Sequence, residues 1–102
     1  MKIIKEIIEA IHEELEGAEN YAKKATQYKM DDKALADNYS MMAAQELDHV
    51  DKLHAQVVRM IKAQQAAGKE VPAAMRAVWD YEHRNFMDKV AKIKVLINMY
   101  KS

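Results

Sequence analysis

The chain has 102 residues, of which 50% are hydrophobic and 31% charged, which excludes intrinsic disorder and indicates a single domain over residues 1–102. Two glycines and one proline exclude collagen-like, low-complexity and most turn-rich β structures. The absence of cysteine excludes disulfides, thiolate metal sites, iron–sulfur clusters and a rubredoxin-type electron-transfer site. Sixteen basic and sixteen acidic residues give a net charge of zero, so no basic excess indicates nucleic-acid binding.

The charge is distributed unevenly along the chain. Residues 1–20 carry six Glu against two Lys, and residues 84–101 carry five Lys or Arg against one Asp. Such polarity can steer cations or set subunit orientation, although most charged helix faces are simply solvated.

No apolar run approaches the roughly 20 residues of a membrane span, and the first residues lack a signal-peptide pattern. We therefore expect a cytoplasmic protein that binds neither membrane nor nucleic acid.

Two breaks divide the sequence into three helices. At the first break, Asp31 or Asp32 can accept the free N–H groups of a following helix. At the second, Gly68 suits the end of a helix and Pro72 the first turn of the next. The long stretches between the breaks are rich in good helix formers. The sequence therefore predicts an all-α fold with helices near 2–29, 32–66 and 72–101.

Each of the first two predicted helices has an apolar stripe, at steps of three and four residues, typical of an antiparallel bundle. On the first helix it comprises Ile4, Ile7, Ile11, Glu14, Ala18, Tyr21, Ala25 and Tyr28, widened by Ile8, Leu15 and Ala22. On the second it comprises Tyr39, Met42, Glu46, His49, Leu53, Val57 and Met60, flanked by Ala43, Leu47 and Val50. Glu14, Glu46 and His49 thus occupy positions that a plain bundle would give to leucine.

A tight turn near residue 30 would bring these three side chains to one level. Glu14 and Glu46 both lie 16 residues from residue 30, or roughly 24 Å along the helix axes. Burying unpaired carboxylates costs several kcal/mol, and no Lys or Arg lies on either stripe near this level. A divalent cation would neutralise them, and carboxylate with imidazole suits iron, manganese and zinc. The alternative is a buried polar network that specifies the helix register.

One Glu from one helix and a Glu-x-x-His from the next make half of the di-iron carboxylate site of four-helix bundles. A full site needs a second Glu and a second Glu-x-x-His at the same level, and a two-fold dimer would supply both. The segment from Glu14 to Tyr21, followed by Glu46-x-x-His49, resembles the ferritin-like superfamily, which includes the rubrerythrins and the half-size encapsulated ferritins. The resemblance covers roughly residues 10–60.

The resemblance implies a ferritin-like hairpin with a third long helix, completed as a four-helix di-metal bundle in a homodimer or larger oligomer. It implies that Glu14, Glu46 and His49 bind iron, two ions per shared site, with manganese or zinc as alternatives. Tyr21 would hydrogen-bond beside the site and share in its chemistry. The chain has no fourth helix, and residues 96–102 continue a helical pattern, so packaging in an encapsulating shell has no support.

Glu82 is a further candidate metal ligand. The third helix has a stripe of its own: Met75, Trp79, Glu82, Phe86, Val90, Ile93, Ile97 and Tyr100. Glu82 lies about 15 Å from the level of Glu46 along the axis, so we expect it to miss the first site within its own chain. It can approach a partner's site or, with His83, form a site where iron enters. His12 and His54 fall on the flanks and are expected to be solvated.

These observations favour a di-iron carboxylate protein that binds Fe(II) and oxidises it, in iron handling or protection from oxidative stress. It would then be an oxidoreductase of the ferroxidase type. One alternative is a non-catalytic helical assembly module that kept a ferritin-like core. The other is a small rubrerythrin-like peroxide reductase, which would need an external electron donor because the chain has no cysteine.

Overall fold

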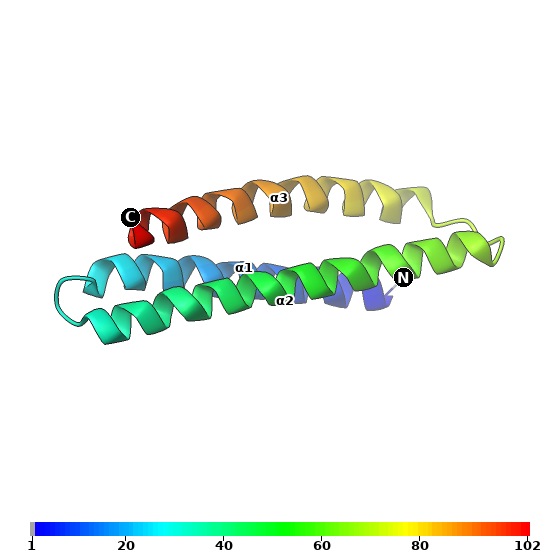
Figure 1. The fold of residues 1–102 in the computed structure, drawn as a ribbon. Coiled ribbons are helices and arrows are strands. Elements are labelled where there is room, and N and C mark those ends of the chain that lie inside the picture. The colour runs from blue at the N-terminus through cyan, green and yellow to red at the C-terminus, as the bar shows by residue number, and fades with distance from the viewer. Residues whose placement is uncertain (1) are drawn as a thin grey trace.

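A computed structural model describes residues 2–102, which form three long helices and no strand (Figure 1). They are α1 (Lys2–Tyr28), α2 (Lys33–Ala66) and α3 (Ala73–Lys101). The predicted all-α class is confirmed, and each helix begins and ends within one residue of its predicted bounds. Within the described part of the chain, none of the three helices combines the length and apolarity that crossing a bilayer requires.

Local sequence sets both turns. The Asp32 side chain caps α2, because its Oδ1 accepts the Leu35 N–H at 3.1 Å. Beyond the end of α2, Gly68 adopts a positive φ of 72°, a conformation that side chains other than glycine rarely take. The Lys69 N–H then reaches back to the Gln64 carbonyl at 3.0 Å, which closes the last turn of the helix. Both breaks in the sequence are therefore turns, and α2 is capped at both ends.

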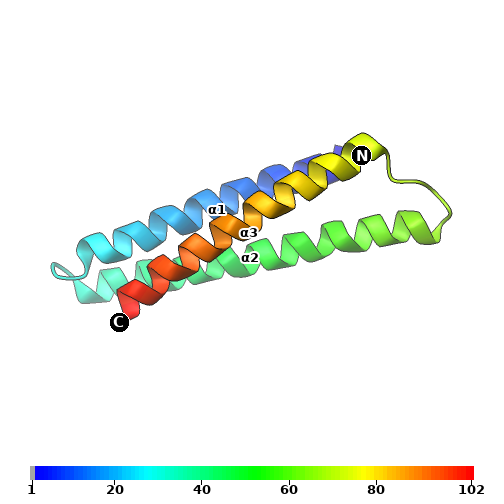
Figure 2. The ribbon, with the colours of Figure 1, turned by 90° about the horizontal axis from the view of Figure 1, so that it is seen from above.

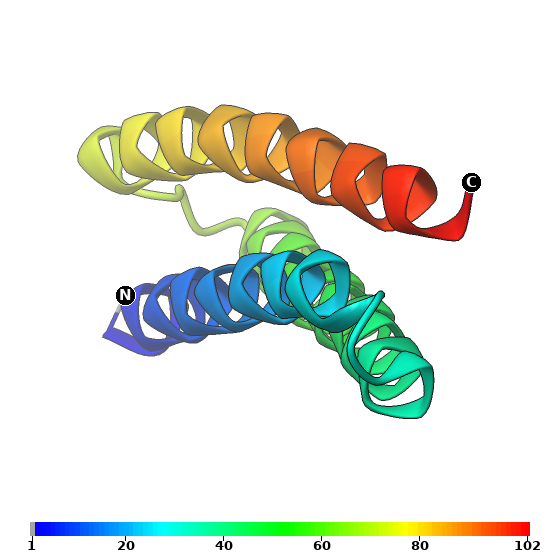
Figure 3. The ribbon, with the colours of Figure 1, turned by 90° about the vertical axis from the view of Figure 1, so that its left-hand side faces the viewer.

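The helices form two layers. α1 and α2 run antiparallel, joined by the short turn, and α3 lies over them as the second layer (Figures 1 and 3). α3 crosses the pair diagonally, from above the first residues of α1 to above the first residues of α2 (Figure 2). The molecule measures 56 × 19 × 18 Å, and α2 extends beyond the start of α1 (Figure 1).

The buried stripe of the α1–α2 pair lies toward the flanking residues of the predicted one. Its buried members are Ile4, Ile8, Ile11, Leu15, Ala18, Ala22 and Ala25 on α1, and Ala36, Ser40, Ala43, Leu47, Val50, Val57 and Ile61 on α2. Glu14 and Glu46 are half-buried at the edge of this core. In the single chain these two carboxylates thus lie at the edge of the apolar interface between α1 and α2 rather than inside it.

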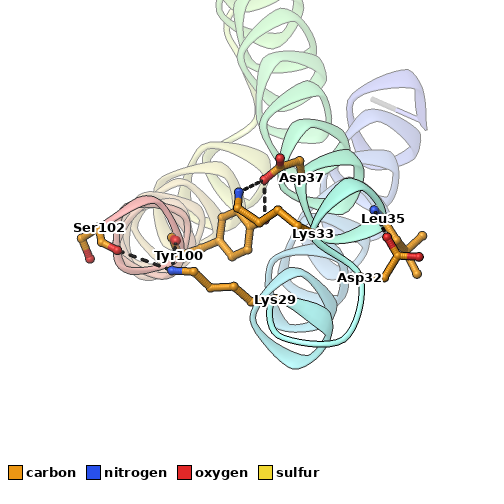
Figure 4. A network of polar contacts seen from close by, with 7 residues as sticks. All are labelled: Lys29, Asp32, Lys33, Leu35, Asp37, Tyr100 and Ser102. Carbon is orange, nitrogen blue, oxygen red and sulfur yellow. Dashed lines mark hydrogen bonds and ion pairs between the residues drawn. The ribbon is translucent and has the colours of Figure 1, made fainter.

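Polar contacts hold the end of α3 against the α1–α2 turn (Figure 4). The Tyr100 hydroxyl donates to Asp37 Oδ1 at 2.5 Å, and Lys33 Nζ donates to the same oxygen at 2.6 Å. Lys29 Nζ donates to the Tyr100 carbonyl at 2.7 Å, and both lysines lie over the Tyr100 ring. The predicted stripe of α3 is largely confirmed, since six of its eight members are buried: Met75, Trp79, Phe86, Ile93, Ile97 and Tyr100.

Candidate metal centre

Two glutamates and one histidine meet across the α1–α2 interface. Glu14 comes from the middle of α1, and Glu46 and His49 come from successive turns of α2. One ligand atom from each lies within 4.8 Å of the other two. His49 Nδ1 is 3.3 Å from Glu14 Oε2 and 3.9 Å from Glu46 Oε1. The structure thus brings together the three residues that the helix register predicted to meet.

The antiparallel register explains the meeting. Tyr21 lies seven residues after Glu14, and Tyr39 lies seven residues before Glu46, so the two tyrosines occupy one level two turns nearer the α1–α2 turn. Their rings stack with centroids 5.9 Å apart, and Tyr28 also stacks with Tyr39 at a centroid distance of 6.1 Å. Tyr21 therefore packs in an aromatic column beside the centre, and its hydrogen bond to a ligand stays a prediction.

The centre faces away from α3. Glu14 lies two residues after His12, and His12 contacts Glu82 of α3. The side chains of His12 and Glu14 therefore point about 160° apart around α1. The exposed fraction of the side chain is 28% for Glu14, 25% for Glu46 and 50% for His49, so solvent reaches all three. We call the half-buried surface around them the open face. It comprises Ile7, Glu14, Gly17, Tyr21, Tyr28, Tyr39, Met42, Glu46, Leu53 and Met60.

The two carboxyl groups have opposite pKa shifts. Interaction with the Glu46 carboxyl, assisted by His49, lowers the pKa of Glu14 although burial opposes the shift. Interaction with the Glu14 carboxyl, together with burial and like-charge repulsion, raises the pKa of Glu46. A proton therefore goes to Glu46 first, and this proton relieves the repulsion between the carboxylates. A divalent cation can relieve it more completely, since it is attracted to both oxygens and to a neutral imidazole nitrogen.

Gly17 makes room for the Glu46 side chain. It lies one turn after Glu14 on α1, and a β-carbon placed on it would be 3.2 Å from Glu46 Oε2. That separation is tighter than an ordinary van der Waals contact, so with any larger residue the Glu46 carboxylate would have to shift by a few tenths of an ångström. Sequence reasoning missed Gly17, although an isolated glycine inside a helix one turn from a candidate ligand is a recognisable signal.

Replacing Gly17 with alanine should stabilise the metal-free protein and weaken its metal binding. We expect the free energy of unfolding of the metal-free protein to rise by about 0.5–1 kcal/mol, because alanine is the better helix former. We expect metal affinity to fall roughly tenfold, because the Glu46 carboxylate is displaced. Chemical denaturation and metal titration measure the two effects. Gly68→Ala is the matched control: its positive φ makes alanine strained, so stability should fall while metal affinity is unchanged.

Glu82 and His12 lie outside this centre. Glu82 Oε2 is 2.7 Å from His12 Nε2, on the side of α1 that faces α3. This agrees with the expectation that Glu82 misses the centre of its own chain. The side chain of His12 is 55% exposed, in agreement with the expectation that it is solvated, and it also pairs with Glu82 and lies edge-to-face with Phe86 at a centroid distance of 4.9 Å.

Comparison of the chain with family models, with characterised proteins and with solved structures finds no match.

Proposed function

We propose that this chain is a ferritin-like di-iron carboxylate protein that binds Fe(II) as its substrate and oxidises it. One observation carries the proposal: Glu14, Glu46 and His49 converge within 4.8 Å on a face that solvent reaches. Two carboxylates and one imidazole are a donor set that suits Fe(II), and also Mn(II) and Zn(II). Three protein donors leave coordination positions for a bridging group and for the oxidant.

Each residue has a distinct part in this proposal. Glu14 and Glu46 neutralise the divalent charge, and their oxygens can bridge two ions. His49 supplies a neutral ring nitrogen, and its contact with Glu14 fixes the imidazole where it is needed. The Glu14 carboxyl and burial raise the pKa of Glu46, and a bound cation would act in the opposite direction by attracting its carboxylate. Bound Fe(II) supplies the electrons, and dioxygen or peroxide accepts them, which makes the activity of the ferroxidase type.

The proposal includes a two-fold dimer, because one chain has donors for only half of a two-iron site. Packing two open faces against each other places two copies of the donor set together in a four-helix arrangement of two α1–α2 pairs. Around the donors, the open face is lined by apolar and aromatic side chains such as Ile7, Tyr39 and Leu53. An isologous interface uses this same surface on both copies, so it needs no further element of the chain.

The direct test is the iron retained per chain after anaerobic Fe(II) loading and desalting, with the oligomeric mass measured on the same sample. We expect about one iron per chain in a dimer or larger ring, and its oxidation on admission of air. No iron in a folded, monodisperse sample would overturn the proposal and favour a helical assembly module. Loading with Mn(II) and Zn(II) in parallel shows which ion the centre prefers.

Turnover separates iron oxidation from peroxide reduction. We expect the protein to oxidise successive additions of Fe(II) without any other protein. If it consumes peroxide catalytically only when a reductase is added, and does not turn over Fe(II), then the activity is a peroxide reductase and the ferroxidase proposal is wrong.

A further inference from the structure

Two histidines meet on the side of the molecule away from the open face. His54 of α2 and His83 of α3 have ring centroids 4.9 Å apart and ring planes inclined by 32°. Both rings lie against Trp79, at 5.5 Å from His54 and 5.7 Å from His83. Both histidines are half-buried. This pair joins the two consecutive helices α2 and α3, and the ferroxidase proposal makes no use of it.

The separation of the rings fits a shared metal ion. Two imidazoles bound to one tetrahedral zinc, at Zn–N distances of about 2.0–2.1 Å, have ring centroids roughly 5 Å apart. We propose that His54 and His83 form a second metal site, which takes Zn(II) or Cu(II) and clamps α3 to α2. Imidazole nitrogen suits both ions.

The surroundings keep the pair available as ligands. Burial, together with the charge of His83, lowers the pKa of His54, which leaves its imidazole neutral and able to bind a cation near neutral pH. The charge of Asp51, one turn earlier on α2, acts in the opposite direction and favours a higher pKa of His54. On the side facing α1, Glu82 is occupied by His12 and does not compete.

Trp79 provides a built-in probe, since it is the only tryptophan in the chain and contacts both rings. Titrating metal-free protein with Cu(II) at neutral pH should quench Trp79 fluorescence, with saturation at one ion per chain. His54→Gln and His83→Gln should each move the midpoint to at least about tenfold higher Cu(II). His12→Gln should leave the titration unchanged, because His12 belongs to the neighbouring pair with Glu82.

Zn(II) gives an independent measurement. It should raise the melting temperature of the wild-type protein, because an ion that binds only the folded state stabilises it. The rise should persist in Glu46→Gln, which lacks the open-face centre, and vanish when His83→Gln is added to that variant. Circular dichroism checks that each variant is folded. The proposal is overturned if the Cu(II) quenching survives in both His54→Gln and His83→Gln, or if Glu46→Gln alone removes it. Neither result bears on iron retention, which is measured separately.

Discussion

Glu46→Gln is expected to abolish iron retention and, in the metal-free protein, to raise the free energy of unfolding at pH 7. Glutamine keeps the shape of the side chain but removes a charge that lies beside the Glu14 carboxylate. Because the like-charged pair is partly solvated, the expected gain is at most about 1 kcal/mol. Iron per chain after desalting and urea denaturation of the metal-free protein measure the two effects.

The raised pKa of Glu46 predicts the direction in which the stability of the metal-free protein changes with pH. The folded protein raises the pKa of Glu46 above its ordinary value of 4.5. The folded state therefore binds this proton more tightly than the unfolded chain, so the contribution of Glu46 to stability is lost as pH rises through the folded pKa. Wild-type protein should show this loss above pH 4.5, and Glu46→Gln should not.

Glu13→Gln is the matched control for this variant. It removes one negative charge from an exposed position next to Glu14, so neither iron retention nor stability should change. Full iron retention by a folded Glu46→Gln protein would contradict the assignment of Glu46 as a ligand.

Local signals in the sequence were sufficient to predict the helices and the meeting of the three donors. Asp32 and Gly68 mark turns whose chemistry does not depend on the rest of the fold. Once the first turn is placed, the constant rise of a helix determines which residues of α1 and α2 share a level. Glu14, Glu46 and His49 follow from that arithmetic, and so does the stacking of Tyr21 on Tyr39.

The burial of the donors could not be predicted in the same way. On α1, both Ile7 and Ile8 continue an apolar stripe, and a period of 3.6 residues fits either choice. Only the position of α3 decides between them, since it buries Ile8 and leaves Ile7 at the edge. The pairing of His12 with Glu82 depends on the same packing of α3 over α1. Such contacts join residues 70 apart in the chain, and helical periodicity holds no information about them.

Ile7→Lys is expected to produce a folded monomer that no longer retains iron. Ile7 lies on the open face, two turns before Glu14, which places the new ammonium group too far away to neutralise the carboxylates directly. In the monomer, the lysine side chain can extend to solvent. In a two-fold dimer formed by the open faces, both lysines would be buried without partners. We expect the dissociation constant of the dimer to rise at least about a hundredfold.

Met41→Lys is the matched control, because Met41 is 53% exposed and lies on α2 outside the open face. Sedimentation velocity and iron per chain should show that this variant is indistinguishable from wild type. If Ile7→Lys assembles like wild type yet retains its iron, the second half of the site comes from some other surface. If it is monomeric and retains iron with unchanged affinity, the three donors of one chain suffice and the centre binds a single ion. A site shared between two copies requires that Ile7→Lys lose assembly and iron together, and that Met41→Lys lose neither. This loss would occur although the variant keeps all three donors: Glu14, Glu46 and His49.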